Sequence, residues 1–295
     1  MARMSGTMRA PVDPEPTSDA VQADRWLAQA ERAARVERTA CGSGQLVWRC
    51  WGRGAPLVLV HGGGGSWQHW LRNIGPLALE RQVWCPDLPA FGDSADPPAP
   101  GGVPEIARAL ADGLDSLFPD DRALDVVGFS FGGIVSAVAA RLRPARIGRL
   151  VVVGSAALGL PRPPFEMRVW RRQTDAAGRR AAHLHNLRAL MLASRADDAL
   201  ALAIHSRNVE RARFNGRATA ASTLLRDVLP EVRARVTGIW GGLDATAQPD
   251  VRAAEAVMRA ALPVVRFEVV PGAGHWVQYE FAARFNALLA DVLAS

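Results

Sequence analysis

The stretch Gly128-Phe129-Ser130-Phe131-Gly132-Gly133 decides the fold of this 295-residue chain. The apolar run Leu124-Asp125-Val126-Val127 precedes it, and a helix-forming run follows over residues 134–140. The pattern predicts a buried strand, a sharp turn and a helix. Because such a turn brings neighbouring chain close, only glycine fits on either side, and the hydroxyl of Ser130 stands out at the carboxyl end of the strand. A bystander serine in a glycine-rich turn is the alternative, and the flanking strand and helix weigh against it.

Apolar runs of strand length recur along the chain and alternate with helical patterns. A turn at Gly42-Ser43-Gly44 joins two expected strands at 36–41 and 46–51. Continuous apolar runs, typical of strands buried on both faces, follow at 56–60, 82–85, 124–127, 150–153, 236–240 and 264–270. Helical patterns such as 105–118 and 250–261 lie between them. This alternation predicts the α/β class, with a mostly parallel central sheet flanked by helices.

One interval, residues 158–235, contains no predicted strand. It begins with the helix-breaking cluster 159–164 and continues with helical patterns over 181–193 and 196–214. We therefore expect a helical cap (lid) at 158–235, inserted between core segments 23–157 and 236–295. An insertion at the carboxyl end of a parallel strand lies over the edge where such sheets bind ligands, so the inner face of this cap is expected to contribute to the pocket.

The composition limits the classes of partner. The formal charge is +6, but all 35 basic residues are arginine and they are spread along the chain, which indicates a compositional bias; no nucleic-acid partner is expected. Residues 1–22 are polar and lack the apolar core of a signal peptide, so a disordered tail is expected there, followed by a helix at 23–35. No apolar run approaches the roughly 18 residues that cross a bilayer, and no membrane partner is expected.

Three cysteines, Cys41, Cys50 and Cys85, lie in or beside apolar segments without metal-ligand spacing. This favours a reducing cytoplasm, and no metal or other cofactor is expected. The expected partner is a small-molecule substrate, and the sequence leaves open whether the chain forms a homo-oligomer.

A nucleophilic serine requires a base and a carboxylate that orients the base. A serine hydroxyl is a poor nucleophile near neutral pH, so an imidazole must take its proton and a carboxylate must orient that imidazole. His275 lies in a loop after the last predicted strand, and Asp244 follows the strand before it. Four other histidines fall in helical patterns, where an exposed or core role is the default: His69, His183, His185 and His205. The chain order Ser130, Asp244, His275 predicts a catalytic triad.

The run His61-Gly62-Gly63-Gly64-Gly65 follows the strand at 56–60 and supplies an oxyanion hole. Glycines let the backbone turn its N–H groups inward toward developing negative charge. The predicted donors are the amides of Gly63 and Phe131, with Gly64 the next choice, and His61 is expected to hold the loop. The run lacks the features of a nucleotide-binding loop.

These motifs resemble the α/β-hydrolase superfamily over nearly the whole chain from Val36. The resemblance rests on these stretches, in this order: His61 to Gly64, Asp87-Leu88-Pro89-Ala90-Phe91-Gly92-Asp93-Ser94, Gly128 to Gly132, Trp240-Gly241-Gly242-Leu243-Asp244 and Gly274-His275. Within that superfamily, further stretches are similar to meta-cleavage product hydrolases, which cut carbon–carbon bonds in ring-fission products of aromatic compounds: Arg72-Asn73, the run 274–280 and Phe285-Asn286.

The narrower resemblance implies an anionic dienoate substrate whose carboxylate is bound by an arginine of the cap. Arg207 is the best positional match, Arg211 is a second candidate, and Trp276 is expected to pack against substrate or in the core. Phe129 stands where that family has asparagine, so a polar contact to the substrate is missing. The alternatives are an ester, thioester or lactone hydrolase, which needs no such group, and a non-catalytic ligand-binding protein on the same scaffold.

Overall fold

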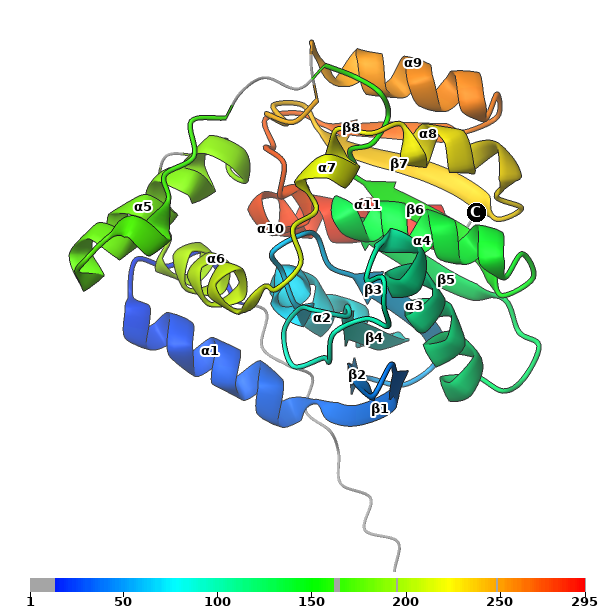
Figure 1. Cartoon of the computed structure of the whole chain (residues 1–295), viewed down its shortest axis with the longest axis horizontal. Helices are drawn as coiled ribbons and strands as arrows, with labels where there is room; N and C mark the ends of the chain where they lie inside the picture. The colour runs from blue at the N-terminus through cyan, green and yellow to red at the C-terminus, as the bar shows by residue number, and fades with distance from the viewer. Residues whose placement is uncertain (1–13, 162–164, 195, 248, 295) are drawn as a thin grey trace, which may run out of the picture.

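The computed structural model describes residues 14–161, 165–194, 196–247 and 249–294, and it confirms the predicted α/β fold. One eight-stranded sheet has the strand order β1-β2-β4-β3-β5-β6-β7-β8 (Figure 1). Strand β2 is antiparallel to both of its neighbours, β1 and β4, and the pairs from β4 to β8 are parallel. The strand bounds are β1 Arg35–Cys41, β2 Gly44–Trp51, β3 Ala55–Val60, β4 Arg81–Asp87, β5 Leu124–Phe129, β6 Ile147–Val153, β7 Arg235–Gly241 and β8 Arg266–Val270.

Helices cover both faces of the sheet, because alternate residues of its central strands point to opposite sides. Val58 and Val60 of β3 belong to a core that includes α3 (Val103–Leu117), α4 (Phe131–Leu142), α8 (Leu224–Val228) and α9 (Val251–Ala261). Leu57 and Leu59 belong to the opposite core, which includes α1 (Ala20–Ala33), α2 (Leu71–Leu77), α10 (Val277–Glu280) and α11 (Ala282–Ala294). Each such fully buried side chain stabilises the fold by about 1.5–3 kcal/mol.

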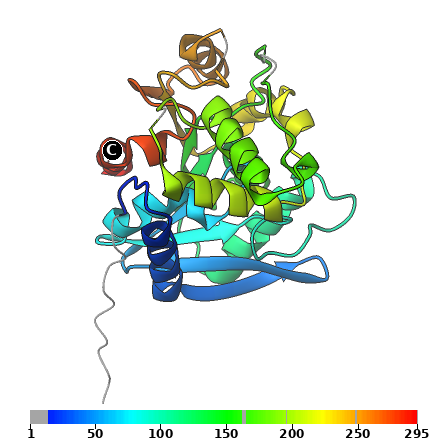
Figure 2. The same ribbon diagram turned by 90° about the vertical axis from the view of Figure 1, so that its left-hand side faces the viewer.

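The cap consists mainly of α5 (Ala176–Leu190) and α6 (Ala199–Arg211), which lie together beside the sheet in two perpendicular views (Figures 1 and 2). Asp175 and Asp198 cap these helices by accepting backbone N–H groups of Gly178 and Ala201, which explains where each helix begins. A single-turn helix α7 (Arg217–Ala220) follows. Helix α8 then packs on α4 in the core. The end of the predicted cap segment 158–235 therefore lies in the layer of helices that covers the sheet.

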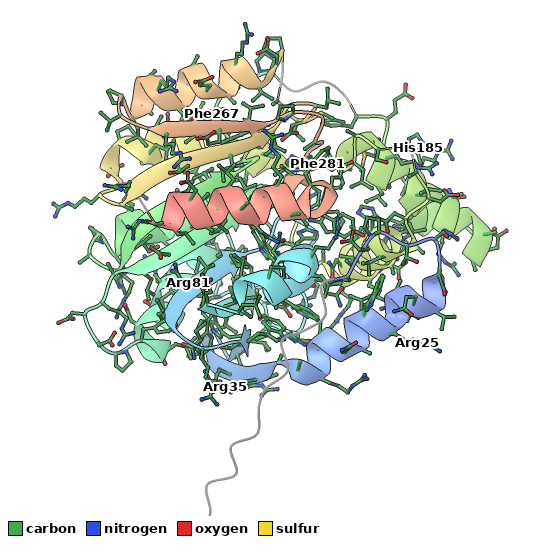
Figure 3. The ribbon with its side chains drawn as sticks, turned by 180° about the vertical axis from the view of Figure 1, so that it is seen from behind. Arg25, Arg35, Arg81, His185, Phe267 and Phe281 are labelled. Atoms are coloured by element: carbon green, nitrogen blue, oxygen red, sulfur yellow. The ribbon has the colours of Figure 1, made fainter. Side chains whose placement is uncertain are left out.

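Residues 14–22 pack against the rest of the chain, although they fall within the segment 1–22 that the sequence predicted to be a disordered tail. Residues 1–13 lie outside the described residues. The buried guanidinium of Arg72 donates to Pro14 O at 2.8 Å and pairs with Glu15 at 2.6 Å, and Thr17 O accepts the amide of Ala199. Helix α1 begins at Ala20 and packs beside α6. Seen from behind, α1 with Arg25 and α5 with His185 lie on the same side of the molecule (Figure 3).

Within the described part of the chain, no helix is long and apolar enough to cross a membrane.

Candidate active site

The serine of the opening stretch sits in a strained turn between β5 and α4. Its backbone has φ 51° and ψ −115°, a conformation that non-glycine residues rarely adopt. A side chain on Gly128 would approach the backbone oxygen of Gly132 to 2.6 Å, so glycine is required there. The turn leaves the Ser130 side chain partly exposed while its neighbours on both sides are buried.

The structure brings Ser130, His275 and Asp244 into one hydrogen-bonded chain. His275 Nε2 lies 3.0 Å from Ser130 Oγ, and His275 Nδ1 lies 2.9 Å from Asp244 Oδ2. Asp244 and His275 are each 4% exposed. This geometry holds the imidazole with its Nδ1–H toward the carboxylate and its Nε2 toward the hydroxyl, the arrangement needed to take a proton from Ser130.

Two further residues, which the sequence did not single out, support this chain. Thr246 donates its backbone N–H and its hydroxyl to Asp244 Oδ1, each at 2.8 Å. Ser155, just after β6, donates its hydroxyl to Ser130 O at 2.8 Å. The spacing Asp244-Ala245-Thr246 is a sequence signal for Thr246, since an aspartate commonly accepts the amide two residues on. No local pattern indicates Ser155, because its partner is 25 residues away.

The glycine loop after β3 lies against the nucleophile. A methyl group built on Gly62 would lie 3.2 Å from Ser130 Cβ, and one on Gly63 would lie 3.6 Å from Phe131 Cβ. Gly65 N–H closes the loop by donating to Gly62 O at 3.1 Å, which leaves the amides of Gly63 and Gly64 outside that bond. The Phe131 amide is the first of α4 and has no acceptor within the helix. The predicted oxyanion donors Gly63 and Phe131 are therefore neighbours in space.

Two buried histidines hold the glycine loop. His61 Nδ1–H donates to Gly62 O at 2.8 Å, and the amide of Leu88 donates to His61 Nε2 at 2.8 Å. The ring is therefore neutral, and both of its nitrogens are hydrogen-bonded. Burial lowers the pKa of His61 to about 4. His69 Nδ1 accepts the N–H of Gly62 at 3.2 Å, and burial holds the pKa of His69 well below its ordinary value. His61 has the structural role predicted for it, whereas the position of His69 beside this loop was not predicted.

Phe129 and Trp276 are both buried beside the catalytic histidine. The Phe129 ring lies 5.0 Å from the His275 ring and 5.5 Å from the His69 ring, between centroids. Trp276 is fully buried, stacks on Tyr279 at 4.2 Å and donates its indole N–H to His69 O at 2.9 Å. Of the two roles expected for Trp276, the structure thus shows the core role. Phe129 presents an apolar wall to the triad and offers no polar group.

The arginines of the cap form ion pairs away from Ser130. Arg207 pairs with Asp24 of α1 at 2.7 Å, and Arg211 pairs with Asp93 and also donates to Gly92 O. Both guanidiniums are about half exposed. The structure thus pairs Arg207 and Arg211 with other residues of the chain, whereas the resemblance implied that an arginine of the cap binds substrate. The reason is the ordered helix α1, which supplies an aspartate to Arg207 and which the sequence did not predict to lie beside the cap.

The loop that carries His275 is fastened to the cap. The amide of Trp276 donates to Met191 O at 2.8 Å. Glu280 accepts the N–H of Gly274 at 2.6 Å and the N–H of Ser194 at 2.8 Å, so one carboxylate joins the residue before His275 to the α5–α6 connection. Movement of this part of the cap would displace His275.

A small, mainly apolar hollow of about 20 Å³ lies beside Ser155 and Thr246. The remaining lining residues are Ala156, Ala157, Leu158, Leu160, Ala220, Trp240, Ala247 and Ala254. The hollow is lined mostly by apolar side chains, and its volume is about that needed for a single water molecule.

Comparison with known proteins places the geometry in context. The sequence of residues 57–288 matches the protein family described as the alpha/beta hydrolase family. The chain is 30% identical over 261 residues to 2-hydroxy-6-oxo-6-phenylhexa-2,4-dienoate hydrolase of Burkholderia cepacia. The matched region covers 83% of this chain and 89% of that protein. It is 32% identical over 248 residues, 79% of this chain, to the dihydrolipoyllysine-residue acetyltransferase component of the acetoin cleaving system of Pseudomonas putida, and spans 62% of that protein's length.

Among solved structures, the enol-lactonase from Burkholderia xenovorans LB400 has a TM-score of 0.70 to this chain at 20% sequence identity, over 88% of this chain and 100% of that one. At this level of identity the likeness concerns the fold alone.

Proposed function

Since the chain belongs to the α/β-hydrolase family, we propose that it is a serine hydrolase in which Ser130 is the nucleophile, His275 the base and then the acid, and Asp244 the residue that orients His275. The observation that supports this most is the hydrogen-bonded chain from Ser130 Oγ through His275 to Asp244 at the carboxyl ends of three strands. The reaction class is hydrolysis of a small carbonyl compound.

The proposed reaction begins with transfer of the Ser130 hydroxyl proton to His275 Nε2 as Oγ bonds to the substrate carbonyl carbon. The negative charge that develops on the carbonyl oxygen is stabilised by the amides of Gly63 and Phe131, at the amino end of α4. His275 then gives its proton to the leaving group, and a water molecule, activated by the same imidazole, releases the product from Ser130. Asp244 stabilises the imidazolium in both steps.

The first candidate for the scissile bond is a carbon–carbon bond in a 2-hydroxy-6-oxo-dienoate. A relative named for that reaction is 30% identical over 83% of this chain, and the apolar ring of Phe129 lies beside His275.

The second candidate is a carboxylic ester, thioester or lactone. Two observations favour it: Phe129 offers no polar group beside the triad, and Arg207 is occupied by Asp24. An acyl compound of this kind requires neither contact.

Covalent labelling tests the nucleophile. A fluorophosphonate probe should modify wild-type protein at Ser130, and Ser130→Ala should lose labelling together with about 10⁶-fold of turnover, since triad residues act as a unit. Ser206→Ala is the matched control, because Ser206 lies on α6 and bonds only to its own helix. Labelling that persists in Ser130→Ala would overturn the assignment, and an unlabelled, inactive wild type would support a ligand-binding protein on this scaffold.

Comparison of rates on p-nitrophenyl esters and on a ring-fission dienoate distinguishes the two candidate bonds.

We place the reaction in a reducing compartment such as the cytoplasm, because Cys41, Cys50 and Cys85 are all buried free thiols. A small-molecule substrate, with no nucleic acid or membrane, is the proposed partner.

A further inference from the structure

The inner face of cap helix α6 carries two buried, uncharged polar side chains. Ile204, His205 and Asn208 follow one another at helical spacing and are buried, whereas Arg207 and Arg211 point to other partners. His205 is 7% exposed and Asn208 is 4% exposed. Buried polar groups in proteins almost always have hydrogen-bond partners, so the partners of these two side chains identify what this face is built to bind.

The amide oxygen of Asn208 accepts a hydrogen bond, whereas its amide nitrogen has no partner among the described residues. Ser66 Oγ accepts the N–H of Gln68 at 3.3 Å and donates its own proton to Asn208 Oδ1 at 2.8 Å. This fixes the amide with its oxygen toward Ser66. The buried Nδ2 group has no hydrogen-bond partner among the described residues. Asn208 therefore presents an N–H donor that the protein does not use.

His205, one turn earlier on the same face, also has an unused nitrogen. Its buried Nε2 has no partner among the residues that the structure describes. Burial lowers the pKa of His205 to about 3, so the ring is neutral at ordinary pH. Its ring packs against that of His183 at 5.8 Å, and His183 Nε2 lies 3.0 Å from Glu210. The neighbouring carboxylate is thus occupied and does not reach His205.

These side chains lie beside the oxyanion loop. Val209, the neighbour of Asn208, would lie 3.3 Å from a methyl group on Gly64, and Ser66 directly follows the loop. His69, which accepts the N–H of Gly62, is close enough to His205 for the two rings to influence each other electrostatically. The segment of α6 that carries the unused groups therefore packs against the same loop that lies against Ser130.

We propose that His205 and Asn208 form a polar subsite that binds an uncharged oxygen of the substrate, such as a ketone, ester or hydroxyl oxygen, away from the scissile carbonyl. The proposal rests on the proposed hydrolase function. Asn208 Nδ2 donates to this oxygen, and His205 Nε2 is the second contact. A carboxylate fits poorly, because Arg207 is paired elsewhere, Glu210 lies nearby, and a buried anion without a cation is costly.

Matched p-nitrophenyl esters test the proposal. Three oxo esters, 4-oxopentanoate, 5-oxohexanoate and 6-oxoheptanoate, carry a ketone at increasing distance from the ester. Unsubstituted esters of equal chain length are the apolar controls, and the monoesters of succinate, glutarate and adipate carry a carboxylate instead. We expect one oxo ester to exceed its apolar control by about tenfold in kcat/KM, the effect of one buried hydrogen bond, and the anionic esters to be poorer than both.

Two variants of Asn208 separate binding from folding. Asn208→Leu removes the Nδ2 donor and the oxygen that accepts from Ser66 without burying a charge. Asn208→Asp keeps that oxygen and removes the donor, and urea unfolding of each variant measures the cost of the change to stability. Both should abolish the preference for the oxo ester, so that the ratio of its kcat/KM to that of the apolar ester falls to about one, while His205→Phe should reduce that ratio. The apolar ester reports in the same preparation that the variant is folded and the triad intact.

The outcomes are distinct. An oxo preference that survives in Asn208→Asp, the absence of any oxo preference in the wild type, or a preference for the anionic ester that disappears in Arg207→Ala would each overturn the subsite while leaving the hydrolase intact. Failure of the wild type to hydrolyse any ester or dienoate, together with no fluorophosphonate labelling of Ser130, would instead overturn the proposed function.

Discussion

The core side and the cap side of the site differ in how their polar groups are satisfied. On the core side, Asp244 and His61 use both ends of their side chains in hydrogen bonds to the protein. On the cap side, the arginines are paired outward and the buried atoms Asn208 Nδ2 and His205 Nε2 have no partner among the described residues. A fully partnered group is held in place for chemistry, whereas an unpartnered buried group is available to a ligand. Under the proposed function, this difference places catalysis on the core side and selection of substrate on the cap side.

The largest expected effect is on the core side. Asp244→Asn should lower kcat by about 10⁴-fold, because the amide no longer favours the imidazole tautomer that accepts the Ser130 proton. Steady-state kinetics on a p-nitrophenyl ester measures the change, with Asp250→Asn, at the start of α9, as the control. A fall of less than tenfold would mean that Thr246 or another group orients His275, and the contrast between the two sides would weaken.

The buried histidines of both sides predict a pH dependence of stability. The pKa of His61 is lowered to about 4 and that of His205 to about 3 by burial. The unfolded chain, with histidine pKa values near 6.5, therefore binds more protons below pH 6.5, and stability present above that pH is lost as the pH falls toward 4. Each histidine should contribute about 1.4 kcal/mol per pH unit to the loss in this window.

Urea unfolding at pH 7, 6 and 5 measures this loss. His205→Gln should flatten the dependence and cost little stability at pH 7, since Nε2 of His205 has no partner to lose. His61→Gln should flatten it as well but also destabilise at pH 7, because two hydrogen bonds are disturbed. His185, on the cap, provides the control His185→Gln (Figure 3). Equal costs of the two variants at pH 7 would contradict the distinction drawn between them.

The contact that joins the two sides should have a smaller effect. Glu280→Gln keeps one acceptor oxygen but removes the other, so one of the two N–H groups, of Gly274 or Ser194, loses its partner. We expect kcat to fall by about tenfold, the value of one such hydrogen bond, with KM nearly unchanged. Glu255→Gln on α9 is the control. A change confined to KM would show that Glu280 serves the cap alone and does not position His275.

The smallest expected effect is at the cap arginine. Arg207→Ala should change kcat/KM on esters by less than about twofold and stability by no more than about 1 kcal/mol, since the pair with Asp24 is half exposed and such pairs contribute little. Asp24→Ala should behave alike. A loss of a hundredfold or more on a dienoate in Arg207→Ala alone would show that this arginine leaves Asp24 to bind a carboxylate, and it would break the division proposed here.

Local patterns in the sequence predicted a large part of the fold. Eight strands were predicted near their observed positions, because strands buried on both faces require continuous apolar runs. The turn at Ser130 and the order Ser130, Asp244, His275 were readable because each lies where a strand ends. The hydrogen bonds of the structure join those three residues across separations of 145 and 31 positions.

Predictions that depended on distant partners fared differently. Arg207 was expected at the substrate, but Asp24, 183 residues away, occupies it. His69 resembled an ordinary helical histidine, and only its approach to Gly62 shows that it holds the oxyanion loop. Residues 14–22 look like a polar tail, yet the buried Arg72 binds Pro14 and Glu15. No periodicity in the sequence encodes such pairings.

The sequence by itself thus determined the α/β layering, the strained serine turn and the identities of the candidate catalytic groups, because hydrophobic periodicity and glycine sterics act over a few residues. Only the tertiary structure decided which cap side chains face Ser130 and which are already paired. That choice depends on the segments that pack around α6. Helix α1 pairs with Arg207, the loop after β4 with Arg211, and α5 with Glu210, while His205 and Asn208 keep hydrogen-bonding groups without partners among the described residues.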